Sequence, residues 1–296
     1  MTVTAAQVKE LRDKSGAGMM DAKKALVENN GDMEAAMDWL RTKGIAKAAK
    51  KASRVAAEGK VLATSNGTAG AMVEVNSETD FAAKNEKFQE FADTMLNLVL
   101  ESGESNVDTL LGMTYPNSDI TVKDKQTELV ATIGENISLR RAAYASNESG
   151  TVGAYVHMGG KIGVLTTISG ATAQDEVAKQ IAMHVAASAP QFLTRDDINP
   201  DVLAREKAIY EEQAAASGKP ENVVQKIVDG RMNKFAEEIC LVDQAFVMDT
   251  DRKVGQVVSE AASGASLSAF TRFALGEGIE KKEEDFAAEV AAAVNG

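Results

Sequence analysis

The sequence predicts an α+β fold: a helical N-terminal module, two related α+β subdomains with antiparallel sheets, a protruding antiparallel helical hairpin and a C-terminal helical module. Abundant alanine and only 4 prolines among 296 residues favour helix. Two hairpin signals, at 60–76 and 151–168, are each followed by a helical pattern and later by a strand-like run. The recurrence of that order predicts a duplicated hairpin–helix–strand unit.

The first segment, residues 1–44, is predicted to form three short helices. Thr4 and Gln7 make a capping box before the first apolar stripe, and Asp32 is placed to cap the third helix. Gly44 is expected to end that helix. Because so small a unit has little core of its own, we expect a docking module.

The methionines of this segment allow two interpretations. Methionine side chains adapt well to the surface of a partner, but they also fill irregular cores. We expect Met33 and Met37 to lie in the core, and Met19 and Met20 to be partly exposed.

A basic segment follows, in which Lys43, Lys47, Lys50, Lys51 and Arg54 are spaced among alanines. Both a helix and a linker fit this composition. Its basic face would suit an acidic patch or RNA, whereas the simpler interpretation is a connecting helix with solvated charges.

The first repeated unit begins with the hairpin at 60–76, in which Asn66-Gly67 supplies the turn. Asn85 is a candidate cap for the next helix. The apolar residues of that helix recur at helical spacing: Phe88, Phe91, Ala92, Met95 and Val99. After a linker at about 102–120, a helix at 124–134 and a strand at 136–145 complete the unit.

The second unit follows the same order. Its hairpin at 151–168 turns around Gly159-Gly160, a helix is predicted at 174–188, and the strand at 266–275 resembles the strand that closes the first unit. We therefore expect two related subdomains.

An insertion in the second unit, at 200–238, is predicted to form an antiparallel helical hairpin. Two helical segments, 200–216 and 221–238, are joined by a short turn that contains glycine and proline. The expected seam between the helices consists of Val202, Ile209, Val223, Ile227 and Met232. Projection from the body and packing back onto the core both fit this pattern.

These patterns divide the chain into four expected parts. They are an N-terminal module at 1–50, a first core subdomain at 51–146, a second at 147–276 and a C-terminal module at 277–296. The last part is expected to end in a short amphipathic helix with Phe286 and Val290.

The overall composition argues against several classes of protein. A net charge of −12 does not suit a chain whose main task is to bind nucleic acid, because such binding depends on clustered Lys and Arg. No apolar run approaches the roughly 20 residues of a membrane span, and the N-terminus lacks the apolar core of a signal peptide. The lone Cys240 fits a reducing compartment. We expect a cytoplasmic protein that binds neither nucleic acid nor membranes.

Catalytic motifs are missing from the sequence. The phosphate-binding pattern G-x-x-x-x-G-K-[ST] and the nucleophile pattern G-x-S-x-G do not occur. His157 is expected to be exposed at a hairpin turn, and His184 to be a structural residue beside an apolar helical stripe. With a single cysteine they make a poor zinc site, so we expect no metal, no cofactor and no enzymatic activity.

The clearest functional signal is the stretch at 71–81, AMVEVNSETDF. An apolar strand-like run breaks into a polar tip that ends in Asp80 and Phe81. An aromatic side chain at a loop tip indicates a surface that binds another protein. The local alternative makes Asp80 the N-cap of the next helix and Phe81 a staple onto that same helix.

Several further motifs occur in order along the chain. They are Leu11-Arg12, Gly16-Ala17-Gly18-Met19-Met20-Asp21, Lys23-Lys24-Ala25-Leu26, Glu74-Val75-Asn76, Glu78-Thr79-Asp80-Phe81, Ile133-Gly134-Glu135-Asn136, Arg140-Arg141, Phe246-Val247-Met248 and Gly276-Glu277-Gly278-Ile279-Glu280-Lys281. With them the chain resembles, over essentially its whole length, the elongation factor Ts family, the guanine nucleotide exchange factors of elongation factor Tu. Ala82 stands where the family commonly has Val, and Ala22 where it often has Cys.

The resemblance implies a fold and a partner. The N-terminal helices would be similar to ubiquitin-associated modules and the helical hairpin to a coiled coil. The partner would be elongation factor Tu, in its GDP-bound and nucleotide-free states. The loop residues Thr79, Asp80, Phe81 and Ala82 would enter Tu beside its Mg²⁺ and nucleotide, and so promote release of GDP and rebinding of GTP.

The resemblance also implies two further contact regions on Tu. The N-terminal module, with Arg12, Met19 and Met20, and the C-terminal tail would contact the G domain. The second subdomain, around His157 and Met158, would contact another domain.

Two alternatives come from other classes. An enzyme with its active site between the two subdomains would show a polar pocket with strongly shifted carboxylates. An RNA-binding protein that used residues 43–54 would bind RNA with a steep salt dependence.

Overall fold

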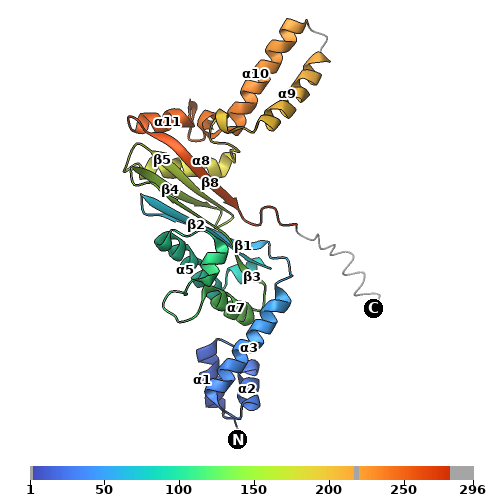
Figure 1. Ribbon diagram of the computed structural model, residues 1–296, viewed down its shortest axis with the longest axis vertical. Coiled ribbons are helices and arrows are strands. Elements are labelled where there is room, and N and C mark those ends of the chain that lie inside the picture. The colour runs from blue at the N-terminus through green and yellow to red at the C-terminus, as the bar shows by residue number, and fades with distance from the viewer. Residues whose placement is uncertain (1–2, 217–219, 281–296) are drawn as a thin grey trace.

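The computed structural model describes residues 3–216 and 220–280, which form an elongated molecule (Figure 1). A bundle of N-terminal helices lies at one end, two sheets with their helices form the middle, and a helical hairpin lies at the other end. The amphipathic helix expected around Phe286 and Val290 falls outside the described residues.

The N-terminal module consists of α1 (Ala5–Ser15), α2 (Met19–Glu28) and α3 (Met33–Lys51). The expected capping box of Thr4 with Gln7 and the expected Asp32 cap are both present. Leu11, Leu26 and other buried apolar side chains fill the space between the helices. Local helix-start signals therefore predicted this module correctly.

The prediction that Gly44 ends the third helix was wrong, because α3 continues to Lys51 and makes the basic segment helical. Gly44 lies against the helix α7 (Val122–Ile133), where an added Cβ would sit 3.4 Å from the Cβ of Ala131. A small residue is needed there for the close approach of two helices, not for a helix end.

The first sheet has the antiparallel order β1 (Glu58–Ser65), β2 (Ala69–Ser77), β3 (Ile137–Ser146). Helix α5 (Glu86–Ser102) is capped by Asn85, as predicted, and buries its apolar stripe against the sheet. The stretch at 102–120 is more than the linker we expected. It contains α6 (Val107–Gly112), which forms because Asn106 caps it and Leu110 is buried in the same core.

The second sheet has the antiparallel order β4 (Gly150–His157), β5 (Ile162–Ser169), β8 (Ser266–Ala274). Helix α8 (Asp175–Ser188) and helix α11 (Val254–Ala261) pack on one face of this sheet. The short strands β6 (Ala245–Phe246) and β7 (Asp249–Lys253) precede α11. The predicted recurrence of a hairpin, a helix and a closing strand is confirmed.

The two sheets pack face to face, so the middle of the molecule has four layers: helices, sheet, sheet, helices (Figure 1). Val61 and Met72 from the first sheet meet Leu165 from the second. An added Cβ at Gly163 would lie 2.5 Å from a methyl carbon of Val61, so this glycine permits the close approach.

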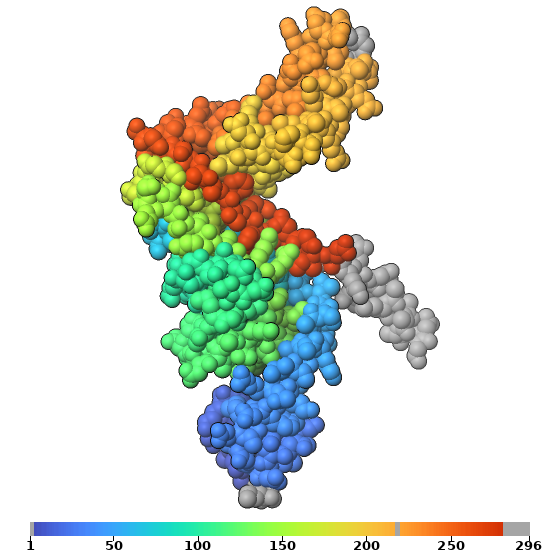
Figure 2. Space-filling model, viewed as in Figure 1, coloured from blue at the N-terminus to red at the C-terminus, as the bar shows by residue number. Residues whose placement is uncertain are grey.

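The helical hairpin consists of α9 (Pro200–Ala215) and α10 (Glu221–Ile239), and Figure 2 shows it standing clear of the body. The predicted seam was partly wrong, because Ile209 and Val223 are exposed. Ala214 and Val228 are the buried residues of the seam instead. The buried stripe of the hairpin therefore differs from the expected one.

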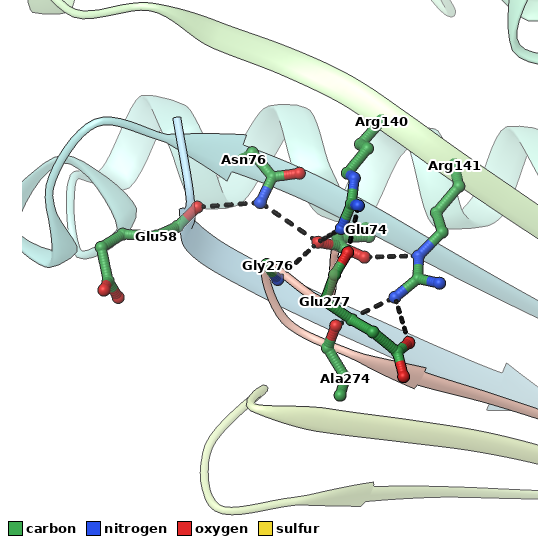
Figure 3. Close-up of polar contacts among 8 residues, drawn as sticks. All are labelled: Glu58, Glu74, Asn76, Arg140, Arg141, Ala274, Gly276 and Glu277. Carbon is green, nitrogen blue, oxygen red and sulfur yellow. Dashed lines mark hydrogen bonds and ion pairs between the residues drawn. The ribbon is translucent and has the colours of Figure 1, made fainter. Parts of the chain in front are cut away.

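A buried carboxylate joins the first sheet to the chain that leaves the second (Figure 3). Glu74 on β2 is fully buried, and its Oε2 accepts a hydrogen bond from Nε of Arg141 at 2.6 Å. Its Oε1 accepts bonds from Nη1 of Arg140 and from the backbone N–H of Gly276, both at 2.9 Å. Arg141 also donates to the carbonyl oxygen of Ala274 at the end of β8.

These partners decide the charge of Glu74. Burial by itself would raise the pKa of its carboxyl, because the charged form loses hydration. The N–H of Gly276 and the guanidinium groups of Arg140 and Arg141 favour the charged form and hold the pKa below its ordinary value. A charged carboxylate therefore ties three segments together inside the protein.

Replacing Glu74 by Gln is expected to lower the free energy of unfolding at pH 7 by roughly 2–4 kcal/mol, because two guanidinium groups lose their counter-ion. The folded pKa lies below the unfolded value of about 4.3, so the carboxylate contributes its stability above that pH. The contribution is lost as the pH falls through the lowered folded pKa. Urea unfolding across pH 7 to 3 should show the difference between wild type and variant narrowing on acidification.

The matched control is Glu101→Gln, which alters an exposed glutamate on α5. It should leave the unfolding free energy nearly unchanged at every pH. If the loss of unfolding free energy caused by Glu74→Gln stayed constant down to pH 3, it would contradict the conclusion that Glu74 is charged in the folded protein.

Candidate functional site

The candidate site is the loop that follows the central strand β2. Thr79 ends the extended chain and is the N-cap of α4 (Asp80–Ala83), a single helical turn. Its hydroxyl oxygen accepts a hydrogen bond from the N–H of Ala82 at 3.2 Å. The Ser77 hydroxyl donates to the Thr79 carbonyl oxygen at 2.8 Å, which closes the turn from the other side.

Phe81 projects from this turn into solvent, with 78% of its surface exposed. The local alternative was wrong on both residues, because Thr79 rather than Asp80 is the N-cap and Phe81 is not packed onto its own helix. Ala82, which the resemblance places among the loop residues that enter the partner, is buried in the chain. The turn therefore presents one large apolar side chain outward and anchors itself through a small one.

Lys84 contacts both residues at the tip. Its Nζ lies 2.6 Å from Oδ2 of Asp80 and 5.3 Å from the centre of the Phe81 ring. The hydrogen bond from Lys84 is the largest of the effects that lower the pKa of Asp80. Sequence reasoning missed Lys84, although its spacing of four residues from Asp80 is a usable signal on a helix.

A carboxylate from a distant part of the chain holds the turn in place. Glu135, which follows α7, accepts hydrogen bonds from both the N–H and the hydroxyl of Thr79. Glu78, next to Thr79, accepts a bond from the N–H of Asn136. Sequence reasoning assigned no role to Glu135 or Glu78 in holding the loop, and no local spacing connects residues that lie 56 positions apart.

The predicted contact residues of the N-terminal module lie at its surface. Met20 is 75% exposed and Met19 is about half exposed, at the start of α2. Arg12 is half exposed on α1 and pairs with the neighbouring Asp13. Met33 is partly buried against the core of the module, as expected.

The predicted residues of the second subdomain lie at the turn between β4 and β5. Met158 is 71% exposed, with a positive φ of 50°. His157 was expected to be exposed but is half-buried, because its Nδ1 is hydrogen-bonded to the Tyr155 hydroxyl at 3.0 Å. Both residues are far from the Phe81 loop along the chain. Their turn belongs to the second sheet, whereas the Phe81 loop follows β2 of the first sheet.

His184 is a structural residue, as predicted. It is fully buried, with Nε2 2.8 Å from the Gln244 side-chain oxygen, and its Nδ1 accepts the N–H of Val247 at 3.1 Å. Burial lowers the pKa of this histidine, against the opposing effect of Gln244. Within residues 3–216 and 220–280, no group of three metal-ligating side chains is placed to hold a metal ion. No helix in these residues has the length and apolar character to cross a membrane.

Comparison with known proteins shows extensive similarity. The family model for Elongation factor TS matches residues 78–277. Elongation factor Ts of Magnetococcus marinus is 54% identical over 303 residues, covering 100% of both chains. Elongation factor Ts of Rhizorhabdus wittichii is 55% identical over 306 residues, and that of Bartonella henselae is 50% identical over 308 residues, with at least 99% of each chain covered.

These matches show which class of protein the chain belongs to, the translation elongation factors. The chain belongs to the elongation factor Ts family. Membership confirms the resemblance seen in the sequence motifs and supports a nucleotide-exchange role in translation elongation.

Replacing Lys84 by Met is expected to raise the pKa of Asp80 toward its ordinary value, because the Lys84 hydrogen bond is the main cause of its lowering. The side-chain carboxyl carbon of Asp80, followed by NMR over pH 2–6, measures this directly. Lys87→Met, on the exposed surface of α5, is the matched control and should leave the titration unchanged. An unaltered Asp80 titration in the Lys84 variant would contradict the assignment.

Proposed function

We propose that this protein is a guanine nucleotide exchange factor of elongation factor Tu, which it binds in the GDP-bound and nucleotide-free states. In this proposal the loop at 79–82 enters Tu, disturbs the Mg²⁺ site and promotes release of GDP so that GTP can rebind. The protein shifts the equilibrium of nucleotide binding to its partner and does not catalyse the making or breaking of covalent bonds. It acts in the cytoplasm, where translation takes place.

The observation that carries the proposal is the exposure of Phe81 on a turn that is held from several sides. An aromatic ring left in water forgoes roughly 1.5–3 kcal/mol of burial free energy, which a binding partner can supply. The surrounding hydrogen bonds order the turn before binding, so little conformational entropy remains to be lost. This combination suits a side chain that is inserted into another protein.

The proposed mechanism follows from differential binding. A factor can shift the equilibrium of nucleotide binding to Tu only if it binds nucleotide-free Tu more tightly than nucleotide-bound Tu. By reciprocity, nucleotide then weakens the binding of the factor. Mg²⁺ is the vulnerable element because it requires near-ideal octahedral geometry at about 2.0–2.1 Å, so a small shift of the surrounding loops by Phe81 would remove ligand contacts.

Other parts of the chain are proposed to supply affinity. The N-terminal module at 1–50 offers Met19 and Met20, and the turn between β4 and β5 offers Met158, all as exposed apolar side chains. Methionine is unbranched and flexible, so it adapts its shape to a partner's surface. The parts at 51–146, 147–276 and 277–296 are proposed as the two core subdomains and the C-terminal module.

The structure gives no support to the two alternative functions, an enzyme with its active site between the two subdomains and an RNA-binding protein. The space between the two sheets is filled by apolar side chains, and the buried Glu74 has its charge satisfied by partners. A groove of about 510 Å³ lies elsewhere, between the N-terminal module and α7. In the basic segment, Lys47 pairs with Asp21 and Arg54 with Glu78, which leaves a weaker basic face for RNA than the sequence indicated.

Replacing Phe81 by Ala is expected to slow factor-stimulated release of GDP from Tu by about 10- to 100-fold, because the wedge loses its apolar surface. The side chain is exposed, so the thermal unfolding midpoint should stay within about 1 °C. Stopped-flow release of a fluorescent GDP analogue measures the rate. The control is Ile209→Ala, another exposed apolar residue, on α9. Wild-type release rates with the Phe81 variant would sink the proposed mechanism.

Deleting residues 1–40 is expected to weaken binding to nucleotide-free Tu by about tenfold or more, while the maximal release rate changes less. The deletion removes the core of the module but keeps the part of α3 that packs on α7 through Gly44. Titration calorimetry gives the affinity, and circular dichroism checks that the remainder is folded. Unchanged affinity in a folded truncation would contradict the role assigned to the module.

A further inference from the structure

We propose that Glu135 is a positioning residue for nucleotide exchange, which acts by fixing the orientation of the turn that carries Phe81. This inference rests on the function proposed above. Glu135 touches neither the partner nor the nucleotide in this proposal, and its effect passes through Thr79.

Both oxygens of the Glu135 carboxylate are used on Thr79. Oε2 accepts the Thr79 N–H at 2.9 Å, and Oε1 accepts the Thr79 hydroxyl at 2.7 Å. Because the hydroxyl proton is directed to Glu135, the lone pairs of the hydroxyl oxygen are left for the N–H of Ala82. Glu135 thus sets the direction of the cap on which α4 depends.

The anchor is itself held in place. The carboxylate of Glu78 accepts the N–H of Asn136 at 2.5 Å, and that of Glu135 accepts the N–H of Thr79. Two reciprocal carboxylate-to-amide hydrogen bonds therefore join residues 78–79 to residues 135–136. The Asn136 side chain donates to the carbonyl oxygen of Arg54 at 2.7 Å, and Lys51 donates to that of Gly134. Since the chain enters β3 at Ile137, the turn at 134–136 is fixed from both ends.

This anchoring matters because α4 is a single turn. An isolated turn has too few hydrogen bonds to be stable, so its orientation depends on its cap and on tertiary contacts. Charge-assisted bonds from a half-buried carboxylate are among the strongest available for this purpose. Without them Phe81 would still be present and exposed but would adopt several orientations, and a functional group requires placement within about 0.5 Å.

The primary test measures release of a fluorescent GDP analogue from Tu over a range of factor concentrations. Glu135→Ala is expected to lower the maximal release rate about tenfold with a smaller change in the half-saturating concentration, because the other contact surfaces are intact. Glu135→Gln retains one acceptor oxygen and should fall between wild type and Glu135→Ala. Glu101→Ala, on the exposed face of α5, is the control and should behave as wild type.

The double variant Glu135→Ala with Phe81→Ala separates positioning from general stability. If Glu135 acts through Phe81, the double variant releases GDP no more slowly than Phe81→Ala alone. Multiplicative slowing of the double variant, or wild-type rates with Glu135→Ala while Phe81→Ala is slow, would overturn this inference and leave the proposed function intact. Wild-type rates with Phe81→Ala would overturn both.

Discussion

The structure depends on the burial of strand β2 on both of its faces. Val73 and Val75 pack against the helices on one side, and Met72 packs against the second sheet on the other. With β1 and β3 as hydrogen-bonded neighbours, the strand has no freedom to shift in register, since a slip of one residue would exchange its two faces. The point where β2 ends is therefore fixed, and with it the base of the turn that carries Phe81.

The partners of Glu74 explain why a charge is tolerated between the sheets. Glu74 and Met72 lie on the same face of β2, so Glu74 faces the second sheet, where an unpaired carboxylate would be strongly unfavourable. The chain leaving β8 supplies the Gly276 N–H and accepts from Arg141 through Ala274. The charge cluster thus holds residues 274–277 against the first subdomain.

The sequence predicted features that depend on neighbouring residues. Strand-like apolar runs on either side of a glycine-containing turn predicted the hairpins, and side-chain spacing predicted the Thr4 and Asp32 caps. It failed where the decisive partner is distant in the chain. Gly44 was taken for a helix end because its contact with Ala131 has no local signature, and the bond between Glu135 and Thr79 has none either.

The candidate site was predicted only in part for the same reason. Phe81 was identified because an aromatic residue at the end of a polar tip conflicts with the usual composition of loops. Its exposure, however, depends on which residue caps α4, and Thr79 rather than Asp80 has the geometry to do so because Glu135 orients its hydroxyl. Local propensity favours either residue as a cap, so only the tertiary contact decides between them.

The roles of the two tip residues differ in kind. The ion pair of Asp80 with Lys84 is exposed, and such pairs contribute little to stability and are screened by salt. A partner can therefore separate Asp80 from Lys84 with little opposition, and each charge is then available to a group of opposite sign on that partner. The ring of Phe81 has a much larger free energy to gain from burial. In the proposed mechanism, the aromatic side chain supplies the driving force for displacing the partner's loops, while the charges beside it determine which surface accepts the ring.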